Sequence, residues 1–210
     1  MKYVWIHDNS DLGTVQHTGN ISSLSVSVHH TDDYVEENKE FLLDLLCEIN
    51  VFPLYAAIEE YDEYEENEDF LKRHQYEYDI KPWADKRVYW TLGKTHSYHP
   101  PCFHVKVKTM ADLIKLMTQT YYLAAQNQFF GLSFHKPIEF VIETKRRFWK
   151  KGEWSVPFID NDSETTMLII DHDGQGFTIY SNEEKFSSIE AIQSQLPHGY
   201  KVGQEIEPIE

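Results

Sequence analysis

Residues 165–181 read TTMLIIDHDGQGFTIYS, in which two runs of strand length flank Asp173-Gly174. An Asp-Gly pair between apolar runs is the strongest short-range signal of a β-hairpin, because both residues accept the positive φ angles of a tight antiparallel turn. The β-branched and aromatic residues of the two runs also suit a pleated, buried surface. We therefore predict two antiparallel strands, over 165–170 and 177–181.

Further strands follow from alternation of apolar and polar residues. The segment 21–28 alternates from Leu24 to Val28, which is the period-2 pattern of a half-buried strand. Four more segments have the composition and length of strands: 87–92, 103–108, 138–143 and 154–159. A His/Pro-rich loop is expected between the strands at 87–92 and 103–108.

Helical spacing predicts the helices. Asp33 and Glu36 favour the free amides and positive end of a helix start. The apolar stripe that follows consists of Val35, Leu42, Leu45, Leu46 and Ile49. A second helix is predicted over 54–74, because its apolar residues lie on one side and its acids occupy the remainder.

Two helices are predicted in the second half of the chain. Thr109 and Asp112 can cap a helix with Met110, Leu113 and Met117 on its inner side. A short helix is expected over 188–196, before Pro197. Because helices and strands do not alternate regularly, the fold class is α+β, with a mainly antiparallel sheet and about three to four helices packed on it.

Length and composition set the broad class. The chain has 210 residues, 41% of them hydrophobic and 14% aromatic, which is typical of one globular domain over 1–210. A subdivision near 81–85 is the alternative, with a helix-rich acidic part over 1–80 and a strand-rich part over 86–210. No stretch approaches the roughly 20 apolar residues that span a bilayer, and the N-terminus turns polar too early for a secretory signal.

Two cysteines, Cys47 and Cys102, are too few for a disulfide framework. Cys47 lies among apolar residues, where a thiol is expected to behave as a small hydrophobic side chain. These features predict a cytoplasmic protein that is not attached to a membrane.

The least ordinary feature is an acidic run at 59–69, with eight carboxylates in eleven residues and no base among them. The run carries half of the formal net charge of −16. Concentrated negative charge repels nucleic acid and attracts basic proteins or cations. Calcium is not expected, because an EF-hand-like loop needs a Gly that this run lacks. The predicted partner contacts are Glu59, Glu60, Tyr61, Asp62, Glu63, Tyr64, Glu65, Glu66, Glu68 and Asp69.

A plainer interpretation of the acidic run is a solvated helix face. It could be neutralised within the chain by the basic segment 145–151, which holds Lys145, Arg146, Arg147, Lys150 and Lys151. Like charges four residues apart each cost a helix a few tenths of a kcal/mol, so such a helix frays without a cation beside it.

A second candidate site is the segment 96–104, with the side chains His96, His99, Cys102 and His104. Imidazole and thiolate are the ligand types that zinc prefers. We expect no cofactor, and the alternative is zinc or another divalent transition metal bound by these side chains. The spacing H-x2-H-x2-C-x-H is not a usual structural-zinc pattern, and two prolines stiffen the loop. The plainer interpretation is a turn-rich loop that leads into a strand.

Two functional hypotheses can be stated with residues, and a third, a small-molecule or regulatory domain whose aromatic residues line a pocket, has no ligand that the sequence selects. The leading one is a non-enzymatic binding protein whose acidic, tyrosine-bearing surface docks or neutralises a basic protein. Its physics would be similar to that of inhibitors and immunity proteins or of nucleic-acid mimics. The alternative is a metal-dependent hydrolase or phosphoesterase that uses the His/Cys-rich loop. The sequence has no G-x-S-x-G, P-loop, dinucleotide fingerprint, H-E-x-x-H or C-x-x-C motif, so serine and cysteine nucleophiles have no support.

Overall fold

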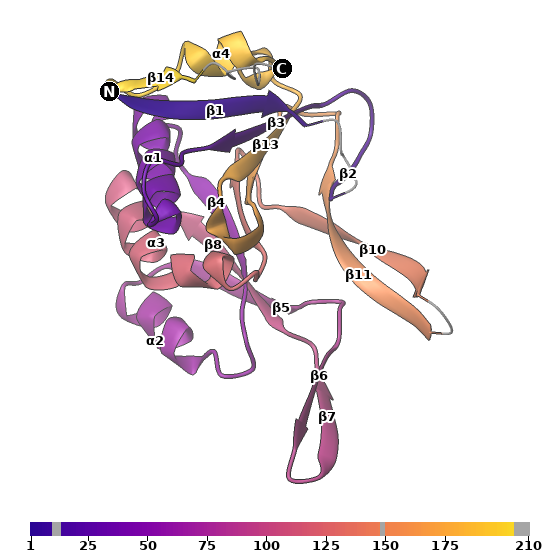
Figure 1. Ribbon diagram of the computed structural model, residues 1–210. Coiled ribbons are helices and arrows are strands. Elements are labelled where there is room, and N and C mark those ends of the chain that lie inside the picture. The colour runs from indigo at the N-terminus through magenta and orange to yellow at the C-terminus, as the bar shows by residue number, and fades with distance from the viewer. Residues whose placement is uncertain (10–13, 148–149, 204–210) are drawn as a thin grey trace, which may run out of the picture.

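The computed structural model describes residues 1–9, 14–147 and 150–203, and the side chains of 145–151 are not described. Its helices are α1 (Tyr34–Ile49), α2 (Glu65–Arg73), α3 (Met110–Ala125) and α4 (Ile189–Gln193). Its strands are β1 (Lys2–Asp8), β2 (Gln16–His17), β3 (Ser22–Ser27), β4 (Leu54–Glu59), β5 (Glu77–Pro82), β6 (Arg87–Thr91), β7 (Lys94–Tyr98), β8 (Pro101–Val107), β9 (Phe130–Phe134), β10 (Glu139–Arg147), β11 (Lys150–Ile159), β12 (Thr166–Ile170), β13 (Phe177–Ser181) and β14 (Tyr200–Val202) (Figure 1).

One large sheet organises the fold. Its nine strands run in the order β14-β1-β3-β13-β12-β9-β4-β8-β5, and all neighbours are antiparallel except β1 and β14. A second sheet joins β10, β11 and β2, and β6 pairs with β7 alone. The prediction of an α+β fold with a mainly antiparallel sheet is confirmed. Strands from both sides of residues 81–85 share the large sheet.

The hairpin predicted from Asp173-Gly174 lies at the centre of this sheet. Strands β12 and β13 pair antiparallel over their whole length, from Thr166 opposite Ser181 to Ile170 opposite Phe177. Asp173 and Gly174 have φ angles of 56° and 69°, in the left-handed region that favours Gly and tolerates Asp. The turn is a short 3-10 segment, His172–Gly174.

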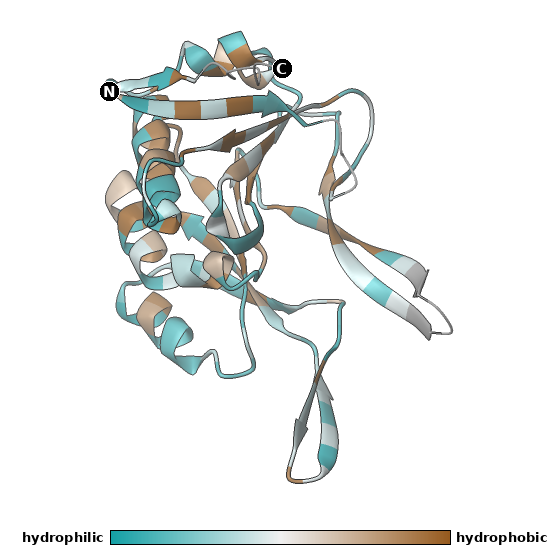
Figure 2. Cartoon of the chain, in the orientation of Figure 1, coloured by the Kyte–Doolittle hydropathy of each residue, from teal (hydrophilic) through white to brown (hydrophobic). Residues whose placement is uncertain are grey.

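Helices cover one face of the sheet, and a smaller apolar layer lies on the other. The main core packs α1 and α3 on the strands through fully buried side chains such as Phe41, Leu116 and Phe130. Successive strand residues point to opposite faces, so Ala57 and Cys102 belong to a second cluster under the β10–β11 arm. Figure 2 shows apolar residues on the packed strands and helices, whereas α2 is mostly hydrophilic.

The prediction of one helix over 54–74 was wrong. Leu54–Glu59 is strand β4, hydrogen-bonded between β8 and β9, and only Glu65–Arg73 is helical. A strand buried on both faces is a continuous apolar run, and periodicity alone does not distinguish such a run from a buried helix.

Two local expectations are corrected by the structure. Part of the expected His/Pro-rich loop is strand β7, which pairs with β6 around the two-residue turn Leu92-Gly93. Cys47 is exposed on α1, not packed as a small hydrophobic side chain, whereas Cys102 is buried. No helix within the described part of the chain is both long enough and apolar enough to cross a membrane.

Candidate functional site

The acidic run begins inside the protein, at the end of β4. Glu59 is buried and forms an ion pair with Arg87, 2.7 Å from Nη2 to Oε1. The backbone N–H of Phe129 also donates to Glu59 Oε2, over 3.2 Å. Burial raises the pKa of Glu59, although the Arg87 guanidinium opposes this shift. Glu59 therefore anchors the segment and is not part of the exposed surface.

Glu60 is buried as well, and no base pairs with it among the described residues. The side-chain amide of Asn67 donates to its Oε1 over 2.6 Å, and Gln119 donates in turn to Asn67 Oδ1 over 2.9 Å. Burial in this neutral network raises the pKa of Glu60 to about 7. A carboxyl with this pKa is about half protonated near neutral pH.

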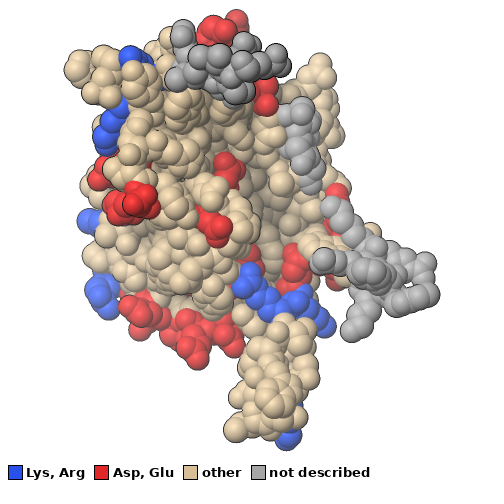
Figure 3. Space-filling model, viewed as in Figure 1, with Lys and Arg blue, Asp and Glu red and all other residues tan. Residues whose placement is uncertain are grey.

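The exposed part of the run lies on α2 and on the loop before it (Figure 3). Its exposed carboxylates are those of Asp62, Glu63, Glu65, Glu66 and Asp69. Three acids in the first turn suit the positive end of the helix, which explains why α2 begins here. Glu68, in contrast, is held by Lys72 at 2.9 Å and by the Tyr78 hydroxyl at 3.0 Å.

The first four of these exposed carboxylates have no ionic partner in the described part of the chain: no ion pair there involves Asp62, Glu63, Glu65 or Glu66. The proposed neutralising bases of 145–151 have side chains outside the described residues. Tyr61 and Tyr64 are half-buried. The Tyr64 ring packs on Phe103 at 5.8 Å, and the Tyr61 hydroxyl bonds to Gln126.

Beside this surface, the β6–β7 hairpin projects from the body of the protein (Figure 1). Its root is attached to the start of the acidic segment, because the Arg87 guanidinium pairs with Glu59 and lies over the Tyr61 ring at 5.7 Å. Its far end exposes apolar side chains to solvent. Trp90 is 73% exposed and Leu92 is 96% exposed.

The two faces of the hairpin differ. On one face Tyr89 stacks on His96, with ring centroids 5.3 Å apart, and contacts Tyr98 edge-on at 5.9 Å. Val88 and Trp90 alternate with these residues and lie on the other face, where they are exposed. Large apolar side chains exposed together on one short element are typical of an interaction site.

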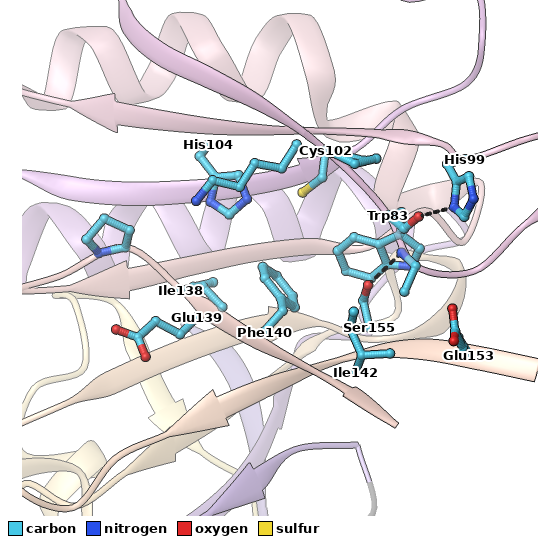
Figure 4. Close-up of a pocket in the computed structure, with 14 residues that line it drawn as sticks. Trp83, His99, Cys102, His104, Ile138, Glu139, Phe140, Ile142, Glu153 and Ser155 are labelled. Carbon is cyan, nitrogen blue, oxygen red and sulfur yellow. Dashed lines mark hydrogen bonds between the residues drawn. The ribbon is translucent and has the colours of Figure 1, made fainter. Parts of the chain in front are cut away.

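A cleft of about 750 Å³ lies between β8 and the β10–β11 arm (Figure 4). Trp83 forms its inner wall, with its ring packed on Phe129 at 5.2 Å and Phe140 at 4.9 Å. Cys102 and His104 face the cleft from β8. Burial raises the pKa of the Cys102 thiol, and burial together with nearby Lys81 lowers the pKa of His104, so both groups are neutral at pH 7.

The four predicted metal ligands are not brought together. His96 is in the β6–β7 hairpin, and His99 bonds through Nδ1 to the Trp83 carbonyl at 2.8 Å. Of the four, His99, Cys102 and His104 line the cleft, and His96 does not. Among the described residues, the one group of three ligand atoms within 4.8 Å of one another is His135, Glu164 and Glu183.

Sequence reasoning did not identify Trp90 and Leu92 as surface residues. A strand was expected at 87–92, but a strand pattern does not show whether its apolar face is covered by another element. Gly93 was the signal in the sequence that could have revealed the hairpin. It follows one predicted strand and precedes Lys94-Thr95, as expected for a two-residue hairpin loop.

The chain was compared with protein-family models, curated proteins and solved structures, and none of the three comparisons gave a match.

Proposed function

We propose that this protein is a non-enzymatic binding protein that docks a basic protein partner. The observation that supports the proposal most directly is that an acidic surface and an exposed apolar hairpin lie side by side. The carboxylates of Asp62, Glu63, Glu65 and Glu66 have no ionic partner among the described residues, and the adjoining hairpin exposes Trp90 and Leu92. We name these two elements together the docking surface: residues 62–69 and the β6–β7 hairpin.

The two elements have different physical roles. Carboxylates at the rim attract a positively charged partner over about 8 Å at physiological salt and raise its association rate. Aromatic and aliphatic anchors that become buried in the complex set the dissociation rate. Arg87 is a positioning residue, since it contacts both Glu59 and Tyr61 and so fixes the hairpin beside the acids.

The charge of the docking surface favours a protein over other macromolecular partners. Nucleic acid would be repelled by the carboxylates, and the formal net charge of −16 would add to that repulsion. An anionic membrane would be repelled for the same reason. A protein with a patch of Lys and Arg around an apolar pocket complements both the acids and the hairpin.

The test is differential capture with a variant that neutralises three exposed acids: Glu63→Gln, Glu65→Gln and Glu66→Gln. The native chain and the variant are exposed to the same extract of the source cells at low salt. The protein retained by the native chain is then identified, purified and titrated calorimetrically against both. We expect binding to weaken about ten-fold or more in the variant and to show a smaller dependence on salt.

A matched control removes the same number of negative charges elsewhere, through Asp32→Asn, Glu48→Gln and Asp162→Asn, which are exposed and distant from α2 in the sequence. This control is expected to bind as the native chain does. Equal losses in the two triple variants would show that net charge and not the docking surface determines binding. Equal binding by all three proteins would remove the acids from the interface.

A further inference from the structure

A separate cluster of possible metal-ligand side chains lies at one end of three neighbouring strands in the middle of the large sheet. His135 follows the end of β9, Glu164 precedes the start of β12, and Glu183 follows the end of β13. The order β13-β12-β9 with antiparallel pairing brings these three positions together. The cluster lies at the end of β9 that pairs with Leu54, the first residue of β4, whereas the acidic run begins at Glu59, the last residue of β4.

The distances within the cluster match a metal coordination shell. The ligand atoms of His135, Glu164 and Glu183 all lie within 4.8 Å of one another, and His135 Nε2 is 3.4 Å from Glu183 Oε1. Two ligands that are each about 2.1 Å from a tetrahedral ion lie about 3.4 Å apart. The same separation is long for a hydrogen bond between these two atoms.

The carboxylate of Glu183 is held in place by its surroundings. Its side chain is only 6% exposed, and its Oε1 accepts a hydrogen bond from the Thr166 hydroxyl. Fixed, hydrogen-bonded carboxylates of this kind are typical of metal ligands.

The loops that carry the other two residues are tied to this anchor. Lys136 Nζ donates to Ser163 Oγ over 3.2 Å, which joins the loop of His135 to the loop of Glu164. The backbone N–H of Thr165 donates to Asn182 Oδ1 over 2.8 Å, which joins the loop of Glu164 to that of Glu183. His135 itself has a φ of 69°, so its imidazole is presented from a left-handed backbone position.

We propose that His135, Glu164 and Glu183 form a binding site for one divalent transition-metal ion. One imidazole and two carboxylates suit Zn²⁺, Co²⁺ or Mn²⁺ better than Ca²⁺, which prefers six or more oxygen ligands. His135 and Glu164 are exposed, so water completes the coordination shell. The buried Glu183 distinguishes this site from a surface pair such as His172 and Asp173, in which neither side chain is buried.

Lys185 is the competing cation at this site. Its ammonium lies 2.9 Å from Glu183 Oε2, on the carboxylate oxygen that does not face His135. A metal on Oε1 and the ammonium on Oε2 would therefore share one carboxylate, and each cation would weaken the binding of the other to that carboxylate. Removing the ammonium with Lys185→Gln is expected to tighten metal binding about three-fold or more.

The test is titration of the purified, chelator-treated chain with Zn²⁺ and Co²⁺, by calorimetry and by the visible absorption of bound Co²⁺. We expect one ion per chain and a loss of affinity of about ten-fold or more in His135→Asn and in Glu164→Gln. Asn tolerates the left-handed backbone at position 135, and residue 164 is exposed, so circular dichroism should show both variants folded.

His172→Ala is the matched control, because it removes a histidine from an exposed His–Asp pair of 2.9 Å without touching the cluster. It is expected to bind metal as the native chain does. Absence of Zn²⁺ and Co²⁺ uptake by the native chain would overturn the proposal. Uptake that survives both His135→Asn and Glu164→Gln would overturn it too, as would weaker binding in Lys185→Gln.

Discussion

Arg87 and Glu59 are joined by an ion pair of 2.7 Å, from Nη2 to Oε1, that connects the first residue of β6 to the last residue of β4. Glu59 is buried, whereas the Arg87 side chain is one-third exposed. Strand β6 pairs with β7 alone. Among the described residues, the hairpin root is therefore attached to the acidic segment by this ion pair and by the contact of Arg87 with the Tyr61 ring.

Replacing Arg87 with Gln is expected to destabilise the fold by about 1–3 kcal/mol, since it leaves the buried Glu59 carboxylate without its cation. Partial exposure of the guanidinium favours the lower half of this range. Urea unfolding followed by circular dichroism measures the change. Arg73→Gln, an exposed Arg at the end of α2, should stay within about 0.5 kcal/mol of the native chain. Equal effects of the two substitutions would contradict the role assigned to the ion pair.

The buried carboxyl of Glu60 is expected to make stability depend on pH. Its pKa is about 7 in the folded state against an ordinary value of 4.5, so the folded chain binds the proton more tightly than the unfolded chain. Stability therefore falls as pH rises from about 4.5 to 7 and is lowest, for this group, above 7. The cost of ionising it is roughly 3 kcal/mol.

Glu60→Gln isolates this contribution, because the amide oxygen can still accept from Asn67 but does not ionise. The difference in unfolding free energy between the variant and the native chain should grow in favour of the variant between pH 5 and pH 8. Urea unfolding at several pH values gives this difference. A difference that stays constant over that range would show that Glu60 does not carry the shifted proton.

Much of the fold was predictable because local patterns and tertiary structure agree. Strand 165–170, strand 177–181 and the Thr109-capped helix have the periodicity and turn or cap residues that their places demand, and each is confirmed. In α3 the Thr109 hydroxyl accepts from the Asp112 backbone N–H, as that spacing predicts. Strand β4 was not predictable, because its burial on both faces is a property of the sheet order and not of its own residues.

The candidate sites were predictable only where they are continuous in sequence. The acidic run is visible as a run, but Glu59 is buried at the end of a central strand and paired with Arg87, 28 residues away, and Glu60 is buried against Asn67. The proposed metal site combines residues 135, 164 and 183 from three strand ends, so no spacing rule could reveal it. The His/Cys-rich segment looked like a ligand set, yet strand β7 directs His96 away from Cys102.

The two thiols should differ sharply in reactivity. Cys47 is exposed, whereas Cys102 is buried and its pKa is raised by burial and by the nearby Glu59 carboxylate. Because the thiolate is the reactive form, a disulfide reagent at pH 8 should modify about one thiol per native chain quickly and the second only after unfolding. Cys47→Ser should abolish the fast reaction. Fast modification of both thiols would contradict the packing of β8 against the β10–β11 arm.

Substitutions of the exposed apolar side chains of the hairpin should affect partner binding without affecting stability. Trp90→Ala with Leu92→Ser removes two side chains that contact solvent, so unfolding free energy should change by no more than about 0.5 kcal/mol. Binding of the proposed basic partner, measured by surface plasmon resonance, should weaken about ten-fold or more through faster dissociation. The acid-to-amide variant of α2 should instead slow association and reduce its salt dependence.

Ile142→Ser is the control for this prediction, because Ile142 is 67% exposed on β10 and outside the docking surface. It should leave both rates unchanged. If the hairpin variant binds with native rates while the acid variant does not, the carboxylates alone make the interface and the hairpin has another role. If the hairpin variant loses stability by more than about 1 kcal/mol, its anchors pack within the fold, and the loss of binding cannot be assigned to direct contact.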